Sequence, residues 1–280
     1  MLTRPCRSAL YIPGSKARAL DKARDLPADA ILFDLEDAVA PEEKLNARVA
    51  LADALAKGGY GYRLRIVRIN ALDSPWGADD AAALASMDCD AVLLPKVNGP
   101  AEIDALASVV SEMPIWAMME TPLAILNAAS IAAHPRLQGI VMGTNDLAKD
   151  IGSRSRAALS TALQLSLLAA RAHGIVALDG VYNAFRDVEG LARECAEGRD
   201  LGFDGKTLIH PDQIAAANAA FAPSAEELTL AERQIAAFDA AMLAGQGVAV
   251  VDGRIVESLH IVTARAILAK AAAIATMETT

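Results

Sequence analysis

Two acidic residues close neighbouring apolar runs in the middle of the chain. Glu120 ends the run at residues 116–120, and Asp146 follows the run at residues 139–142 within the polar turn GTND. A carboxylate placed directly after a buried strand costs desolvation free energy unless a metal ion or a base balances its charge. Mg2+ takes one or two protein carboxylates and fills its other octahedral positions with water and substrate oxygens. Glu120 and Asp146 are therefore predicted to bind one Mg2+, although a turn-stabilising or helix-capping role would also explain each acid.

An arginine and two further acids follow earlier apolar runs. Glu36 and Asp37 come after the second run, and Arg68 lies near the end of the third. Both acids are catalytic candidates that would orient metal-bound water, and Asp37 would alternatively open the following loop. Arg68 beside a metal would hold a substrate carboxylate or neutralise a developing oxyanion. An ion pair of Arg68 with Glu36 or Asp37 is the alternative, and the two arrangements are compatible.

The elements that must position these residues alternate regularly along the chain. Short apolar runs bounded by turn residues predict eight strands, at residues 9–12, 30–33, 64–69, 91–94, 115–118, 139–142, 175–178 and 207–209. Helical spacing lies between them, at residues 18–24, 41–56, 78–86, 101–111, 155–173 and 187–198. This alternation predicts a (β/α)8 TIM barrel, an α/β fold whose active site forms at the carboxyl ends of the strands. The acids and Arg68 should therefore converge on one face.

The last part of the chain has a different pattern. Residues 1–222 are predicted to form the catalytic barrel, and residues 223–280 a helix, a hairpin and a second helix. The capping box SAEE opens the first helix, and the dipeptide Asp252-Gly253 favours a type I′ hairpin turn. This extension is predicted to be a lid or an oligomer contact.

Composition restricts the class of protein. A chain of 280 residues with 54% hydrophobic and 22% charged positions can bury the core of one barrel domain. The net charge of −9 argues against nucleic acid or an anionic membrane as a partner. The spacing of Cys6, Cys89 and Cys195 predicts reduced thiols, and the four dispersed histidines form no zinc pattern. No segment resembles a signal peptide, so a cytoplasmic location is expected.

Seven sequence blocks together resemble the HpcH/HpaI aldolase and citrate lyase β-subunit family, most closely its CitE-like and malyl-CoA lyase branch. They occur in the order of that family, between residues 7 and 213: RSALYIPGS, ILFDLEDAV, RIN, LLPKV, METP, MGTNDLAKD and GFDGKTLIHPDQI. The resemblance implies a magnesium-dependent TIM barrel, commonly a trimer. It also implies that the enzyme makes or breaks a carbon–carbon bond between an acyl-CoA and an α-keto acid such as glyoxylate, pyruvate or oxaloacetate.

The resemblance also assigns roles to individual residues. Glu120 and Asp146 match the metal ligands of the family, and Arg68 matches the arginine that contacts the keto acid and the enolate oxygen. The backbone amides of one short segment would line the keto-acid carboxylate: Gly143, Thr144 and Asn145. The positions that fall where the family approaches CoA are Lys16, Lys206 and His210.

The general acid or base of malyl-CoA lyase-like members is an aspartate in a C-terminal segment, Gly-x-Met-Ile-Asp, that covers the neighbouring subunit's site. The corresponding segment here reads GRIVE, so Glu257 takes the position of that aspartate. A glutamate is one methylene longer, and proton transfer tolerates little misplacement. Asp252 is an alternative base, although its place before Gly253 is better explained by the turn.

The resemblance and the residues together predict a carbon–carbon lyase that uses Mg2+. The substrate would be a dicarboxylic 3-hydroxyacyl-CoA such as malyl-CoA or citramalyl-CoA. Two alternatives stay open: a citrate lyase β-subunit that acts on a citryl thioester of an acyl carrier protein, and an aldolase of free hydroxy keto acids. The acyl group and the direction of the reaction, including synthase and thioesterase activity, are not fixed by these patterns.

Overall fold

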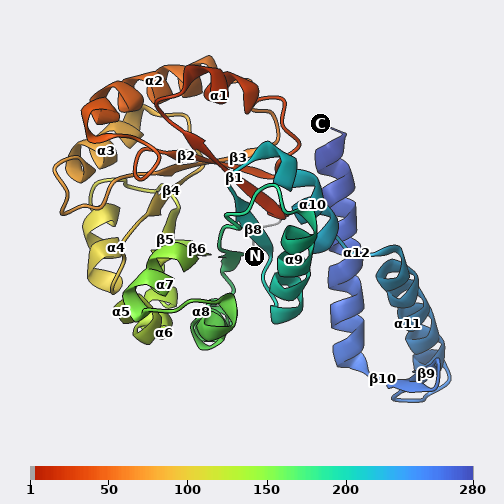
Figure 1. The fold of residues 1–280 in the computed structure, drawn as a ribbon. Helices are drawn as coiled ribbons and strands as arrows, with labels where there is room; N and C mark the ends of the chain where they lie inside the picture. The colour runs from red at the N-terminus through yellow and green to blue at the C-terminus, as the bar shows by residue number, and fades with distance from the viewer. Residues whose placement is uncertain (1–3, 280) are drawn as a thin grey trace. The chain divides into compact units, whose positions relative to one another are not determined.

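Eight parallel strands close into a barrel in this computed structural model, which describes residues 4–279 (Figure 1). The strands are β1 (Ser8–Pro13), β2 (Ala30–Asp34), β3 (Leu64–Arg68), β4 (Ala91–Leu94), β5 (Ile115–Met119), β6 (Leu137–Met142), β7 (Val176–Asp179) and β8 (Gly205–Leu208). Each strand pairs with the next, and β8 pairs with β1 to close the ring. The predicted (β/α)8 barrel is confirmed.

Helices connect the strands and form the outer layer of the barrel (Figure 1). They are α1 (Ala17–Lys22), α2 (Lys44–Lys57), α3 (Gly77–Ala83), α4 (Pro100–Ala107), α5 (Pro122–Leu126), α6 (Ala128–Ala132), α7 (Thr144–Ile151), α8 (Ser160–His173), α9 (Val188–Leu201) and α10 (Ile214–Phe221). Short 3-10 segments are η1 (Pro41–Glu43), η2 (Leu84–Ser86), η3 (Arg156–Leu159) and η4 (Pro211–Gln213). The segment GTND was expected to be a turn, but Thr144 already begins α7.

Alternation along the strands divides the core into two layers. Side chains of one parity fill the barrel interior, among them Leu32, Ile66, Trp116 and Leu178. Side chains of the other parity pack against the helices. Trp116 needs room in this interior, since a Cβ added at Gly139 would lie 2.5 Å from its ring. The filled interior leaves the strand ends as the place for a site.

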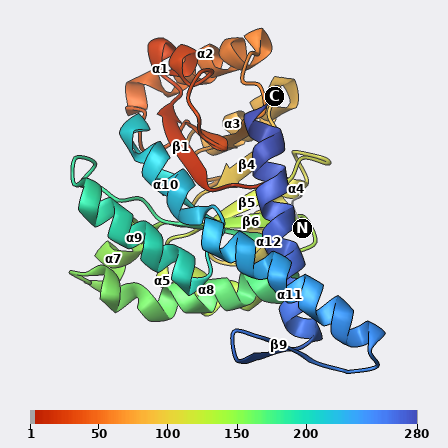
Figure 2. The same cartoon turned by 90° about the vertical axis from the view of Figure 1, so that its right-hand side faces the viewer.

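The rest of the described chain forms a second compact unit, which comprises residues 222–279 together with Arg4 and Pro5. Its elements are α11 (Ala225–Leu243), β9 (Ala249–Val251), β10 (Arg254–Val256) and α12 (Ser258–Glu278). Figure 2 shows the two helices, which pack against each other. The hairpin turn has positive φ at Asp252 (52°) and Gly253 (73°), as a type I′ turn requires, so the predicted hairpin is confirmed.

The helix α12 is long and apolar, and 17% of its most apolar window is buried. By length and composition alone it could cross a membrane, which is weak evidence because core helices of soluble proteins pass the same test. Large apolar side chains are exposed on this unit, including Val250, Ile255, Leu259 and Val262. Such a surface is typical of a face that meets a partner.

Candidate active site

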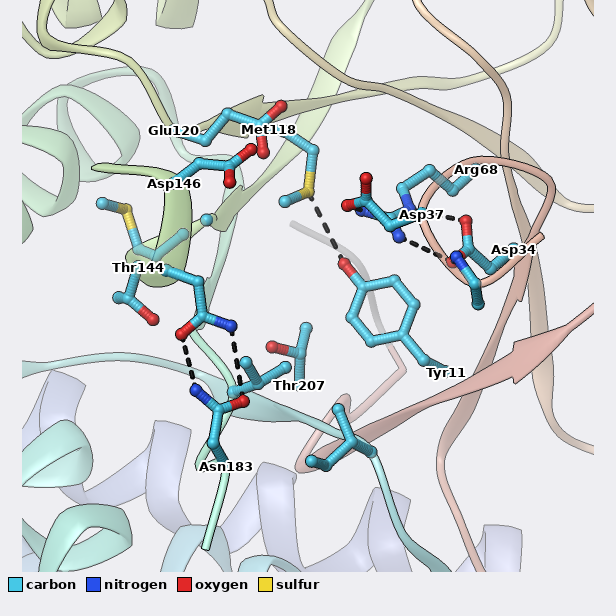
Figure 3. Close-up of a pocket in the computed structure, with 16 residues that line it drawn as sticks. Tyr11, Asp34, Asp37, Arg68, Met118, Glu120, Thr144, Asp146, Asn183 and Thr207 are labelled. Carbon is cyan, nitrogen blue, oxygen red and sulfur yellow. Dashed lines mark hydrogen bonds and ion pairs between the residues drawn. The ribbon is translucent and has the colours of Figure 1, made fainter. Parts of the chain in front are cut away.

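A cavity of about 290 Å³ lies at the carboxyl ends of the barrel strands. Figure 3 shows its lining, with Glu120 and Asp146 close together and Arg68 grouped with Asp34 and Asp37. Four of the five residues predicted to converge line this pocket, namely Asp37, Arg68, Glu120 and Asp146. The fifth, Glu36, contacts Arg68 but does not line the pocket. The pocket lies at the end of a TIM barrel at which catalytic residues are found.

The two predicted metal ligands face each other across one cation. Glu120 is 2% exposed, and burial raises the pKa of its carboxyl. Its Oε1 accepts a hydrogen bond of 2.7 Å from the backbone N–H of Lys96 and lies 3.5 Å from the Lys96 Nζ. The same Nζ forms an ion pair with Asp146. A positive charge is thus already placed between the two carboxylates.

Gly143 permits this close approach. A Cβ at this position would lie 2.3 Å from the Cβ of Glu120, so a larger residue would push the two strand ends apart. Among the residues that the structure describes, no group of three or more acidic, histidine or cysteine side chains could hold a metal. A pair of carboxylates nevertheless fits Mg2+, which takes its remaining ligands from water and substrate.

Arg68 forms a more rigid cluster on the opposite side of the pocket. Its Nε and Nη2 donate to both oxygens of Asp34 at 2.7 and 2.6 Å, in a bidentate pair. Its Nη1 lies 2.9 Å from Glu36 Oε2 and 3.2 Å from Asp37 Oδ2. The predicted alternative, an ion pair with Glu36 or Asp37, is therefore present. Asp34, the main partner, was missed as a site residue.

Glu36 is 9% exposed, and burial raises the pKa of its carboxyl to about 8, although Arg68 opposes the shift. The loop that carries it is held from behind by Lys44. The Lys44 Nζ donates to the carbonyl oxygens of Leu35 (2.9 Å) and Glu36 (2.7 Å) and to Asn70 Oδ1 (2.7 Å). At neutral pH Glu36 can therefore carry a proton, while Asp37 remains exposed and hydrated.

Tyr11 completes the wall between the two clusters. The guanidinium of Arg68 lies 4.8 Å above its ring, and its hydroxyl lies 3.6 Å from Met118 Sδ. Burial raises the pKa of Tyr11 far above its usual range, so the phenol stays neutral. Sequence reasoning missed this residue, although alternation in β1 places Tyr11 on the same face as the interior residue Ala9.

The segment expected to line a keto-acid carboxylate already makes some hydrogen bonds within the protein. The backbone N–H of Gly143 donates to Met119 O at 3.1 Å, so this amide cannot serve a substrate as expected. The N–H groups of Thr144 and Asn145 lie in the first turn of α7, where no intrahelical acceptor is available. The Asn145 side chain exchanges hydrogen bonds with Asn183, which also lines the pocket.

Lys206 does not reach the pocket, contrary to the prediction. It is fully buried, and its Nζ donates to Asp179 (2.9 Å) and Glu194 (2.6 Å) outside the barrel. Thr207 lines the pocket, so alternation in β8 turns its neighbour Lys206 to the opposite face. A buried ammonium held by two acids is not available to CoA.

The other two residues predicted to approach CoA lie in loops at strand ends. Lys16 is exposed between β1 and α1. His210 follows β8, where its ring stacks on Phe185 with centroids 4.6 Å apart and its Nδ1 accepts from Asp212 N–H at 3.2 Å. Both remain candidates for contact with a nucleotide-bearing substrate.

Glu257 lies in the second unit and is exposed at the start of α12. Its backbone N–H donates to His260 Nδ1 at 3.0 Å. Asp252, the alternative base, pairs with Arg233 at 3.0 Å and occupies the hairpin turn. The turn and the ion pair therefore account for Asp252, while the carboxylate of Glu257 is exposed.

The chain is similar in sequence to known proteins. Residues 7–211 match the family described as HpcH/HpaI aldolase/citrate lyase. The (3S)-malyl-CoA thioesterase of Cereibacter sphaeroides (strain KD131 / KCTC 12085) is 63% identical over 274 residues, which cover 97% of this chain and 96% of that protein. The citrate lyase subunit beta of Escherichia coli (strain K12) is 36% identical over 285 residues, with coverage of 96% and 94%.

One solved structure is similar to this chain over almost its whole length. CitE from Mycobacterium tuberculosis, in complex with magnesium, acetoacetate and coenzyme A, has a TM-score of 0.83 and 32% identity. The match covers 97% of this chain and 100% of that one. A second structure, the citrate lyase beta subunit of the same organism with oxaloacetate and magnesium, has a TM-score of 0.71 and 33% identity. It covers 79% of this chain and 99% of that one.

Proposed function

This chain belongs to the HpcH/HpaI aldolase/citrate lyase family, and we propose that it is a magnesium-dependent enzyme that hydrolyses (3S)-malyl-CoA to malate and CoA. The assignment to this family and to its enzymes, made from sequence blocks, is confirmed. The observation that supports the substrate most directly is the 63% identity to (3S)-malyl-CoA thioesterase over almost the whole chain. The pocket suits such a substrate because it offers two acids for a metal and one arginine for an oxyanion.

Glu120 and Asp146 are the residues that would hold Mg2+, in line with the magnesium in the CitE structures. When bound, the ion supplies Lewis-acid stabilisation of charge on the oxygens that the substrate contributes. Glu120 is fixed for this task by the Lys96 N–H, and Asp146 by its place in the first turn of α7. The two acids thereby orient the malyl end of the substrate.

Arg68 is proposed to stabilise the negative charge that develops on the thioester carbonyl oxygen. Its bidentate pair with Asp34 fixes the plane of the guanidinium, and Tyr11 supports the face of that plane. Donors that are held in place before the reaction stabilise an oxyanion without reorganising. This role is the same whether the oxyanion belongs to a tetrahedral intermediate of hydrolysis or to the enolate of carbon–carbon cleavage.

Glu257 is proposed to be the general base that selects between these two outcomes. In hydrolysis it would take a proton from the attacking water, and in cleavage a related acid would exchange a proton with the α-carbon of the acyl-CoA. Its carboxylate is exposed on a unit with a large apolar surface. We propose that this unit serves as a lid and oligomer contact in a homotrimer or a multiple of one.

Carbon–carbon cleavage to acetyl-CoA and glyoxylate is the second candidate, favoured by the citrate lyase subunits among the relatives. The identity of 36% to the subunit of Escherichia coli is much lower than 63%, so action on an acyl carrier protein ranks below action on free malyl-CoA. The enzyme is proposed to be soluble and cytoplasmic, as expected for CoA thioester chemistry.

The test uses full-length protein with (3S)-malyl-CoA and Mg2+, followed by separate assays of free CoA thiol, malate, acetyl-CoA and glyoxylate. Equal amounts of malate and free CoA support the proposed hydrolysis. Acetyl-CoA and glyoxylate instead of malate would establish the second candidate. No conversion of malyl-CoA by either route would remove both, and release of pyruvate from free hydroxy keto acids would then favour the aldolase.

A further inference from the structure

The Lys96 ammonium lies between Glu120 and Asp146, the two residues that would hold Mg2+. Its Nζ lies 3.5 Å from Glu120 Oε1 and is in direct contact with Asp146 Oδ2. An ammonium and a divalent cation cannot both lie between the same two carboxylates. Lys96 and Mg2+ must therefore exclude each other from this position.

The backbone shows that the loop after β4 is shaped to deliver Lys96 to this position. Lys96 has φ of 54°, a left-handed conformation that costs free energy for a long side chain. Two other non-glycine residues that the structure describes share positive φ, namely Ser111 and Asp252. Lys96 also donates its backbone N–H to Glu120 Oε1 at 2.7 Å, so the main chain and the side chain contact the same acid.

A lysine side chain is suited to leave its place between the two acids. Its ammonium is a compact charge on a flexible four-carbon chain, and its contacts here are not bidentate. The Lys96 side chain is 39% exposed, so it can leave towards solvent without opening the core. Without a cation, Glu120 and Asp146 would repel each other across a site in which Glu120 is almost fully buried.

We propose that Lys96 is a positioning residue that holds the metal ligands together when no metal is bound and yields its place to Mg2+. The proposal relies on the metal assignment of the proposed function and not on its substrate. Binding of Mg2+ then requires the ion pairs of Lys96 to break, so the Lys96 side chain lowers the affinity of the site for Mg2+. The released ammonium remains on a loop at the rim of the pocket.

Calorimetric titration of Mg2+ into the full-length enzyme, first stripped with EDTA, tests this directly. Lys96→Met should bind Mg2+ about fivefold more tightly or better, which is the factor expected for loss of one competing ion pair. Lys149→Met is the matched control, because Lys149 is an exposed lysine on α7, the helix that carries Asp146. The control corrects for the general loss of one positive charge and should change affinity by less than twofold.

The thermal midpoint with EDTA and with saturating Mg2+ gives a second readout. Lys96→Met should have a lower midpoint than wild type in EDTA and a larger gain on addition of Mg2+, whereas Lys96→Arg should restore the EDTA midpoint. Lys96→Gln replaces Lys96→Met if the latter does not fold. An affinity for Mg2+ equal to or weaker than that of wild type would overturn the proposal, and so would an equal gain in midpoint. Failure of the wild type to bind Mg2+ would instead refute the metal site itself.

Discussion

The two charged clusters of the pocket have similar composition and different construction. Each combines acids with one basic residue at the strand ends. Arg68 is buried and held by both oxygens of Asp34, with Glu36 and Asp37 on its remaining nitrogen. Lys96 is 39% exposed and contacts its two acids through one nitrogen. Arg68 is therefore a fixed part of the site, whereas the looser contacts of Lys96 suit its proposed exchange for a metal.

The largest effect on turnover is expected from substitutions of the two acids that contact Lys96. Glu120→Gln or Asp146→Asn should lower turnover of malyl-CoA on the order of 10³-fold, since a metal ion is worth several kcal/mol of transition-state stabilisation. Calorimetry should show weaker Mg2+ binding, and circular dichroism should show an unchanged fold. Full activity in both variants would place the metal elsewhere.

Arg68→Met should reduce both the turnover and the stability of the enzyme. Loss of the oxyanion donor should reduce turnover by about 10²- to 10³-fold. Loss of the guanidinium leaves the buried Asp34 carboxylate with backbone hydrogen bonds but without its arginine, which should lower the free energy of unfolding by about 3–5 kcal/mol. Urea denaturation measures the second effect.

Arg68→Lys is the sharper form of this experiment. A lysine cannot reproduce the bidentate pair with Asp34, so it should recover little of either loss. In contrast, Lys96→Arg should be tolerated in stability. Wild-type turnover and stability in Arg68→Lys would show that the Arg68 cluster, like the Lys96 cluster, requires only a positive charge. The two clusters would then not differ in construction.

Glu257 belongs to neither cluster, and its predicted effect is smaller. Glu257→Gln should slow turnover by about 10²-fold, the lower range for a general acid or base, with little change in KM. Glu257→Asp restores the residue of the lyase-like relatives and should raise the proportion of acetyl-CoA and glyoxylate among the products. Unchanged kinetics in both variants would make Glu257 a surface acid.

Lys206 offers a third acid–lysine cluster for comparison, outside the barrel. Lys206→Met should lower the free energy of unfolding by about 1–3 kcal/mol, because Asp179 keeps Arg156 as a partner at 2.9 Å. The KM for malyl-CoA should stay unchanged. A raised KM without loss of stability would restore the original prediction of a CoA contact at Lys206.

The strands and the convergence of several charged residues at their ends could be predicted from sequence because both depend on local order. Buried strands are continuous apolar runs, and the residue after each run faces the mouth of the barrel. Glu120, Asp146 and Arg68 were found in this way and share one pocket. Lys206 was expected from the resemblance alone, and alternation in β8 turns its side chain to the face opposite Thr207.

The rest of the site depends on contacts that no local pattern encodes. Helices as short as α5 and α6 contain too few residues for a 3.6-residue period to be recognised. The bridge of Lys96 to Glu120 and Asp146 joins three separate βα units, and the pairing of Asp34 with Arg68 joins two. Such partners become visible only when the barrel closes.

Glu36 provides the smallest predicted effect, which concerns pH. Its carboxyl has a pKa of about 8 in the folded state against 4.5 without burial, so the folded protein binds more protons between these values. Stability from the neutral carboxyl is therefore fully present below pH 4.5 and is lost as pH rises through about 8. Glu36→Gln mimics the neutral form and should gain thermal stability over wild type when pH is raised from 5 to about 8.5. Asp37→Asn is the matched control, because it removes an exposed acid that also contacts Arg68. A difference between Glu36→Gln and wild type that does not change with pH would mean that Arg68 keeps Glu36 ionised.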